Sequence, residues 1–172
     1  ESHFFCADAD LSACGGSELR IEDVKVTGTR PNSRGFAGHG IAAVDGASLV
    51  AARVLADQNH SAGVLVINNL AATVFDERES ADSRANLSDI TVTNTQMSLG
   101  IDGIEFGDGI AVVNGAATSL ERFDIHDNAR VGLLVGGTAD FRQSSAFFKD
   151  GNVTGHVIGV SVASGWMDLD RD

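Results

Sequence analysis

An internal repeat constrains the fold of this chain more than any other feature. Residues 40–66 and 109–135 align at a constant offset of 69 without a gap, and 11 of the 27 aligned positions are identical. Average residue usage would give only about two identities by chance. Residues 21–27 also match residues 87–93, at an offset of 66. The change of offset from 66 to 69 requires a loop insertion between the two aligned parts. The identical pairs are Gly40/Gly109, Ile41/Ile110, Ala42/Ala111, Val44/Val113, Gly46/Gly115, Ala47/Ala116, Arg53/Arg122, Asn59/Asn128, Gly63/Gly132, Leu65/Leu134 and Val66/Val135.

A shorter period of apolar segments recurs inside each repeat unit. Each segment begins with Gly, and the second follows the first by 23 residues in both units. Short β-branched and apolar runs between Gly, Asn and Asp are typical of β-strands. Residues 49–58 could form a helix, but their repeat partner contains Phe123-Asp-Ile125, which favours a strand. The segments are GIAAV (40–44), GVLV (63–66), GIAVV (109–113) and GLLV (132–135).

Short strands in a unit that cannot bury its own apolar face predict a stacked solenoid. The Leu/Asn consensus of leucine-rich repeats is missing, and propeller blades need about 40 residues with antiparallel alternation. We therefore expect an all-β fold, a right-handed parallel β-helix solenoid of about five coils. The repeat-equivalent residues Ile41, Val64, Ile110 and Leu133 should form an inward aliphatic stack.

The length fits one domain covering residues 1–172. We expect residues 1–18 to form an N-terminal cap or partial coil and residues 163–172 a C-terminal tail or cap. The coils should occupy residues 19–162, with repeat units at 19–86 and 87–138. Asn59, Asn128 and Asn94 should lie at coil corners, because Asn tolerates the left-handed conformation and its amide can bond along the stack.

The coil pattern GI-x-V…L-x-x-Φ-x-I-x-x-N, where Φ is apolar, resembles the pectate-lyase-like right-handed β-helix superfamily. The resemblance covers roughly residues 19–162. It implies the fold and leaves the function open, because that superfamily contains lyases, hydrolases, adhesins and structural proteins.

The charge balance limits the partners. The formal net charge is −12, from 24 acidic and 12 basic residues, and no run of Lys or Arg occurs. This argues against nucleic acid, whose phosphates require a basic surface, and against docking on an anionic membrane. No apolar stretch has membrane-spanning length, so membrane insertion is not expected. A polysaccharide or another cell-surface component is the expected partner, and the oligomeric state is left open.

The two cysteines, Cys6 and Cys14, fit no zinc pattern. They could form a small disulfide loop or remain two thiols. A disulfide would place the chain in an oxidising compartment, and we expect an extracellular or cell-surface location. The chain begins at Glu1 without a signal peptide, which favours a mature chain or an excised domain.

Two loops hold the candidate binding residues. Loops 27–39 and 93–108 occupy equivalent places in the two units, so they should leave the same edge of the stack, two coils or about 10 Å apart. Arginines would bind carboxylate or sulfate groups, and acidic residues would accept hydroxyl groups or bind calcium, the one cofactor that these residues suggest. Ion pairing between the loops is the alternative. The candidate residues are Arg30, Arg34, His39, Asp102, Glu105 and Asp108.

Catalysis is a second hypothesis. Gly38-His39-Gly40 resembles the Gly-His-Gly signature of polygalacturonase-type hydrolases, but the Asn-Thr-Asp and Asp-Asp that should precede it are missing. A polysaccharide lyase needs an Arg or Lys base and a neutralising cation, and the repeated Arg53 and Arg122 are candidates for that base.

The leading hypothesis is a non-catalytic extracellular or cell-surface β-helix module for polar-glycan recognition or assembly. Sugar-stacking surfaces usually need Trp or Tyr, and this chain has only Trp166 and no Tyr. The alternative is a carbohydrate-active enzyme, a polysaccharide lyase before a glycoside hydrolase.

Overall fold

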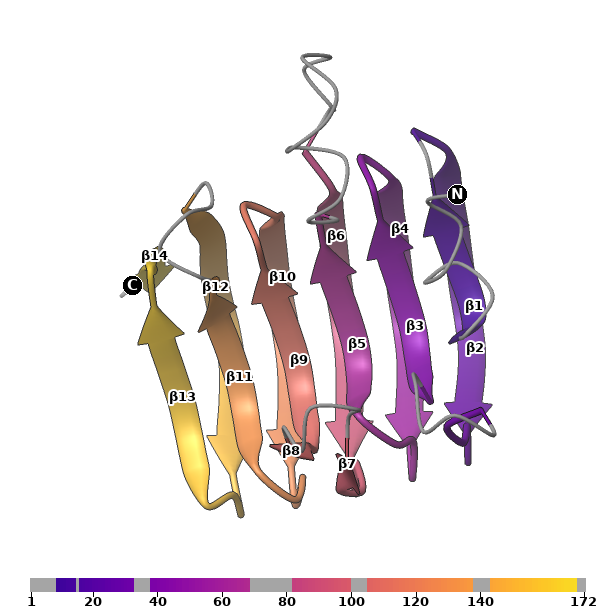
Figure 1. Cartoon of the computed structure of the whole chain (residues 1–172), viewed down its shortest axis with the longest axis vertical. Helices are drawn as coiled ribbons and strands as arrows, with labels where there is room; N and C mark the ends of the chain where they lie inside the picture. The colour runs from indigo at the N-terminus through magenta and orange to yellow at the C-terminus, as the bar shows by residue number, and fades with distance from the viewer. Residues whose placement is uncertain are drawn as a thin grey trace.

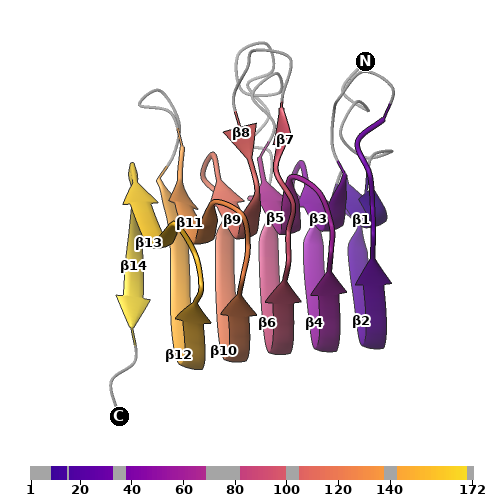
Figure 2. The same ribbon diagram turned by 90° about the horizontal axis from the view of Figure 1, so that it is seen from below.

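The structure is a computed structural model that describes residues 9–14, 16–32, 38–68, 82–99, 105–137 and 143–169. These residues form fourteen β-strands and no helix. Twelve strands form two parallel sheets of six strands each, which face one another (Figures 1 and 2). The all-β class predicted from the repeat is confirmed.

Successive strands alternate between the two sheets, and each sheet keeps the order of the sequence (Figure 1). One short antiparallel hairpin, β7 (Ser98–Leu99) and β8 (Glu105–Phe106), interrupts this alternation. Sheet A contains β1 (Ala9–Cys14), β3 (His39–Val44), β5 (Ala62–Ile67), β9 (Asp108–Val113), β11 (Val131–Gly136) and β13 (Ile158–Ala163). Sheet B contains β2 (Glu18–Thr27), β4 (Ser48–Asp57), β6 (Arg84–Thr93), β10 (Ala117–His126), β12 (Ser144–Thr154) and β14 (Gly165–Leu169).

The core lies between the sheets and consists of rows of apolar side chains. In sheet A, Ile41 pairs with Val64, Val64 with Ile110, and Ile110 with Leu133. Each of these four side chains is at most 1% exposed. The predicted inward stack is therefore confirmed, and sheet B supplies the facing row that includes Leu87 and Leu120.

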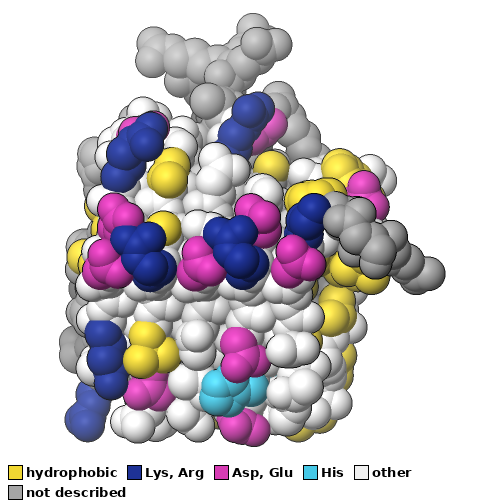
Figure 3. Space-filling model, turned by 180° about the vertical axis from the view of Figure 1, so that it is seen from behind, with side chains coloured by type: hydrophobic (Ala, Val, Ile, Leu, Met, Phe, Trp, Pro, Cys, Tyr) yellow, Lys and Arg dark blue, Asp and Glu magenta, His cyan; other side chains and the backbone are white. Residues whose placement is uncertain are grey.

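The outer faces of the two sheets differ. On sheet A the outward side chains Ala42, Leu65 and Ala111 are apolar and buried in a second cluster. On sheet B most outward side chains are polar or charged and accessible, with apolar side chains such as Phe147 among them (Figure 3). Sheet B is thus the sheet with one face open to solvent, as alternation of apolar and polar residues predicts. Residues 49–58, the one candidate helix, lie in or next to β4.

The three asparagines lie at the corners after the strands of sheet B, as predicted, and they divide the two expected roles. Asn94 has a positive φ, whereas Asn59 and Asn128 do not and lie one position beyond the left-handed residue. The side-chain amides of these two bond to the neighbouring corner: Asn59 Oδ1 accepts from the Thr29 amide at 3.2 Å, and Asn128 Oδ1 from the Thr95 amide at 2.9 Å. The left-handed residues at these corners are Gly28, Gln58, Asn94, Asp127 and Gly155.

The two sheets continue on both sides of the repeat units. β1 lies within residues 1–18, where a cap or partial coil is expected, and β14, within the expected C-terminal tail or cap, is the last strand of sheet B. Cys14, at the end of β1, is in a disulfide, while Cys6, the other cysteine of the sequence, lies outside the described residues. The described segments contain no helical stretch with the length and hydrophobicity of a membrane span.

Candidate functional site

The two predicted loops flank a single turn at one edge of the stack. The His60 amide donates to the carbonyls of Thr29 and Gly38, at 3.2 and 3.0 Å, from the turn between β4 and β5. On the other side of that turn, the Asp108 amide donates to the Ser61 carbonyl at 2.9 Å. The loops therefore leave the same edge, with one turn between them.

Three of the six candidate residues are placed by the structure. Arg30 is exposed, His39 is half-buried at the start of β3, and Asp108 is buried at the start of β9. Arg34, Asp102 and the side chain of Glu105 lie outside the described residues. β5 runs between β3 and β9, so His39 and Asp108 are two strands apart.

Asp108 forms an ion pair with Arg130, a residue that the sequence did not suggest as a candidate. Its side chain is buried and accepts two hydrogen bonds from Arg130, Nε to Oδ1 at 2.8 Å and Nη2 to Oδ2 at 2.5 Å. Burial raises the pKa of Asp108, although Arg130 acts in the opposite direction. The Arg130 guanidinium also lies 6.0 Å from the centre of the Phe106 ring. Arg130 aligns with Ser61 of the other repeat unit, so the repeat gave no indication that an arginine at this position matters.

A row of alternating charges crosses the open face of sheet B (Figure 3). Its members lie at the middle of successive strands, and all have a positive φ between 52° and 56°. A left-handed residue within a strand interrupts the pleat as a β-bulge does and turns its side chain outward. We call this set the charged row: Asp23, Arg53, Asp89, Arg122 and Asp150.

Each arginine of the charged row binds the aspartate of the preceding strand. Arg53 donates to Asp23 through Nε at 2.6 Å and Nη2 at 2.9 Å, and Arg122 donates to Asp89 at 2.8 and 2.9 Å. These hydrogen bonds lower the pKa of Asp23 and Asp89 and raise the pKa of both arginines. The aspartates were missed, although Asp23 and Asp89 are related by the same offset of 66 that relates the neighbouring strands.

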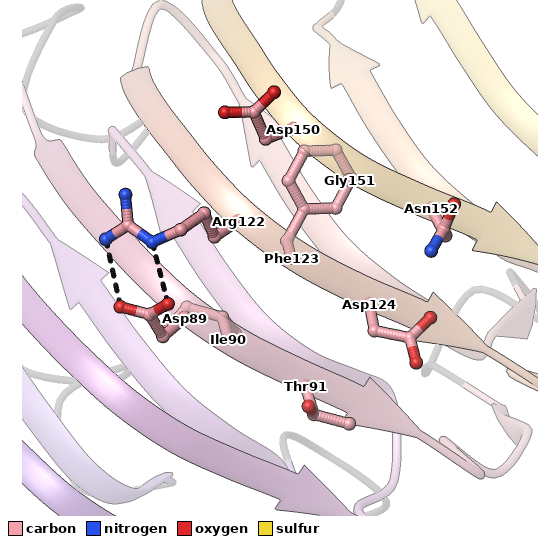
Figure 4. A pocket seen from close by; sticks show the side chains of 9 residues that line it. All are labelled: Asp89, Ile90, Thr91, Arg122, Phe123, Asp124, Asp150, Gly151 and Asn152. Carbon is pink, nitrogen blue, oxygen red and sulfur yellow. Dashed lines mark hydrogen bonds and ion pairs between the residues drawn. The ribbon is translucent and has the colours of Figure 1, made fainter.

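A shallow depression of about 540 Å³ lies at one end of the charged row (Figure 4). Arg122 points toward Asp89, while Asp150 and Asn152 lie on the neighbouring strand. Asp124, Asp150 and Asn152 offer acceptor oxygens, and the one cation of the lining, Arg122, is engaged by Asp89. The depression therefore suits hydroxyl or ammonium donors rather than anions. The lining residues are Asp89, Ile90, Thr91, Arg122, Phe123, Asp124, Asp150, Gly151 and Asn152.

A metal site has little support in the described part of the chain, where no three His, Cys, Asp or Glu side chains lie close enough to hold an ion. The calcium hypothesis rested on Asp102, Glu105 and Asp108. Asp108 is taken up by Arg130, and the other two side chains lie outside the described residues.

Comparison with known proteins gives no relative: no protein-family model, curated protein or solved structure matches this chain. The functional argument therefore depends on the fold and on the geometry of the site.

Proposed function

We propose that this chain is a non-catalytic, right-handed parallel β-helix module that binds a polyhydroxylated glycan on the open face of sheet B. The observation that carries this proposal is the depression at the end of the charged row, with its acceptor groups on adjacent parallel strands. Parallel strands lie about 4.8 Å apart, so their side chains can contact successive groups of an extended polymer.

The β-helix assignment is supported by the alternation of strands between two parallel sheets in sequence order. The same register rows continue through all five neighbouring pairs of sheet B. The coil pattern that resembles the pectate-lyase-like superfamily supports the same assignment. An extracellular or cell-surface location is supported by the disulfide at Cys14, because such bonds persist in oxidising compartments.

The state of the arginines favours binding over catalysis. A lyase base must lose a proton, but Arg53 and Arg122 donate hydrogen bonds to Asp23 and Asp89, and these bonds raise the pKa of both arginines. The alternative, a carbohydrate-active enzyme, would need its catalytic groups elsewhere, with a polysaccharide lyase preferred to a glycoside hydrolase.

The charges favour a neutral or amino-bearing glycan over an acidic one. Two described arginines at the candidate surfaces, Arg122 and Arg130, are both engaged by aspartates. The chain as a whole has a net charge of −12, which repels polyanions. The expectation that Arg30 and Arg34 select carboxylate or sulfate groups stays a separate prediction for loop 27–39, because Arg34 lies outside the described residues.

Binding to three soluble oligosaccharide classes tests the proposal: a neutral glucan, an amino-sugar oligomer and a uronate oligomer. We expect affinity for the first or second class and none for the third.

Asp124→Ala and Asn152→Ala should each weaken binding at least about tenfold without changing the melting temperature. Glu18→Ala is the control, because Glu18 lies in β2 of the same sheet, away from the depression. Binding of the uronate alone, or formation of an unsaturated product from it, would contradict the proposal.

A further inference from the structure

Two aromatic side chains stand on the open face of sheet B. Phe147 of β12 is 37% exposed, and Trp166 of β14 is 53% exposed. Both point outward, because the residues that alternate with them, Ala146, Phe148 and Met167, belong to the core between the sheets or pack against it. Among the described residues of sheet B, no other aromatic side chain is exposed. Figure 3 shows apolar side chains on the β14 side of this face.

The two rings are diagonal neighbours on this face. Trp166 lies in register with Ser145, and Phe147 follows Ser145 by two residues along β12. Diagonal neighbours on one face of paired strands lie about 7–8 Å apart, which is within reach of aromatic side chains. The two rings therefore form one apolar surface. We call this pair the aromatic platform: Phe147 and Trp166.

Charged side chains flank the aromatic platform and connect it to the depression. Asp168 pairs in register with Phe147, and Lys149 and Asp150 follow Phe147 along β12. Asp150 is a member of the charged row and lines the depression. From Phe147 to Asp150 the strand advances by roughly 10 Å. The platform and the depression are therefore parts of one surface.

The aromatic platform belongs to the face of sheet B and not to its edge. Strands of one sheet pair side by side, so a neighbour on the far side of β14 would lie next to Trp166 and leave its outer side open. Phe147 lies further in, because β12 has β10 and β14 on its two sides. The platform therefore does not depend on whether β14 is the last strand of the stack.

We propose that the aromatic platform is a second subsite for the glycan that binds in the depression, so that the polymer runs along β12 from Asn152 and Asp150 to Phe147 and Trp166. This inference rests on the proposed function and extends it. A pyranose ring has an apolar face of C–H groups and a rim of hydroxyl groups. The apolar face would stack on the platform, while the rim would donate hydrogen bonds to Asp168 and Asp150.

The charges along this path agree with a neutral or amino-bearing polymer. The path carries Asp168, Lys149 and Asp150, which leaves an excess of negative charge and no cationic track for a polyanion. A Trp ring also attracts an ammonium group placed over its face. Trp166 thus supplies the stacking group that a glycan-binding surface needs and that the depression lacks.

The fluorescence of Trp166 tests the proposal directly, because the chain contains one tryptophan. The probes are a neutral glucan hexasaccharide and a glucosamine hexasaccharide. Titration calorimetry measures the binding of each probe without reference to the platform. For a probe that binds, we expect one hexasaccharide per chain, a saturable change in Trp166 emission, and the same dissociation constant from both methods.

Variants of the platform should weaken this binding. Trp166→Ala and Phe147→Ala should each raise the dissociation constant of the hexasaccharide about tenfold, whereas Trp166→Phe should retain most of the affinity because it keeps a ring. Val50→Ala is the matched control, since Val50 lies in the register row of Phe147, on the same face of sheet B but in β4. This control should leave the dissociation constant unchanged.

Calorimetric binding without a change in Trp166 emission would overturn the second subsite and leave glycan binding in the depression standing. Unchanged dissociation constants in both alanine variants, or two hexasaccharides per chain, would do the same. If neither hexasaccharide binds by either method, the proposed function and this inference are both overturned. Circular dichroism shows whether each variant is folded. If an alanine variant does not fold, the emission and stoichiometry of the unaltered chain still decide the matter.

Discussion

At the scale of single residues, the charged row combines an unfavourable backbone with favourable side-chain contacts. Asp and Asn visit the left-handed conformation at modest cost, because their short side chains can hydrogen-bond to the nearby backbone, whereas Arg53 and Arg122 are of a residue type that rarely adopts it. Each arginine instead forms two parallel hydrogen bonds to an aspartate of the neighbouring strand. We infer that these ion pairs help to hold the outward bulge in register from strand to strand.

The buried pair of Asp108 and Arg130 should make stability depend on pH in an unusual direction. Burial raises the pKa of Asp108 above that of an unfolded aspartate, so the folded state retains the proton longer as pH rises. Asp108 therefore contributes its full stabilisation at pH values below its pKa in the unfolded chain, and this contribution is lost as the pH rises through its pKa in the folded protein. In urea unfolding, the stability of the wild type relative to Asp108→Asn should be greatest near pH 3 and should fall as pH rises above about 4.

The Asp89–Arg122 pair provides the control with the opposite sign. The hydrogen bonds that Asp89 accepts from Arg122 lower the pKa of Asp89, so the stabilising contribution of this pair is present above the unfolded pKa and is lost as pH falls. The stability of the wild type relative to Asp89→Asn should therefore rise with pH. The same slope for both variants would contradict the assigned pKa directions.

At the scale of elements, the bulge of β12 depends on one glycine. The Phe123 ring of β10 fills the space next to Gly151, and a Cβ atom there would lie 2.4 Å from the ring. Phe123 also packs edge to face against Phe148, with the ring centres 5.9 Å apart. Gly151→Ala should destabilise the fold by about 1–3 kcal/mol through overpacking, as measured by chemical unfolding.

Gly159→Ala is the matched control, because nothing lies within 4 Å of the added Cβ atom in β13. Its effect should stay within about 0.5 kcal/mol. Phe123→Leu should cost less in the Gly151→Ala background than alone, since the smaller side chain relieves the clash. Additive effects of the two substitutions would show that the ring does not set the need for glycine.

The repeat predicted the strands and the core because both follow from local hydrophobic period and from equivalence at a fixed offset. Ile41 and Ile110, for example, occupy one row as their alignment requires. The partners of Arg53 and Arg122 were missed because they lie on strands related by the other offset, 66 rather than 69. Arg130 was missed because its pairing with Asp108 occurs in only one repeat unit, where periodicity carries no information.

At the scale of the whole molecule, the repeating unit contains two strands of each sheet rather than one; the word coil here means one strand of sheet A with the strand of sheet B that follows it. Along sheet B, aspartate and arginine alternate in the charged row. Inside the corners, the amides of Thr29 and Thr95 are each capped by the asparagine of the next coil. Adjacent coils are therefore complementary, not identical, which explains why the clearest sequence identity has an offset of 69 residues and not that of one coil.

This two-coil unit predicts that a large deletion is tolerated better than a small one. Removing residues 41–109 joins Gly40 to Ile110 and deletes two coils, so Arg122 takes the place of Arg53 beside Asp23. Removing only residues 41–63 deletes one coil and sets Asp23 beside Asp89. Although the second variant keeps more core, we expect it to unfold at the lower denaturant concentration, because like charges meet and the Thr29 amide loses its acceptor, Asn59 Oδ1. Adding Asp23→Arg to that variant should restore the alternation and raise its unfolding midpoint. A midpoint that stays unchanged, or a two-coil deletion that fails to fold, would show that alternation does not define the unit.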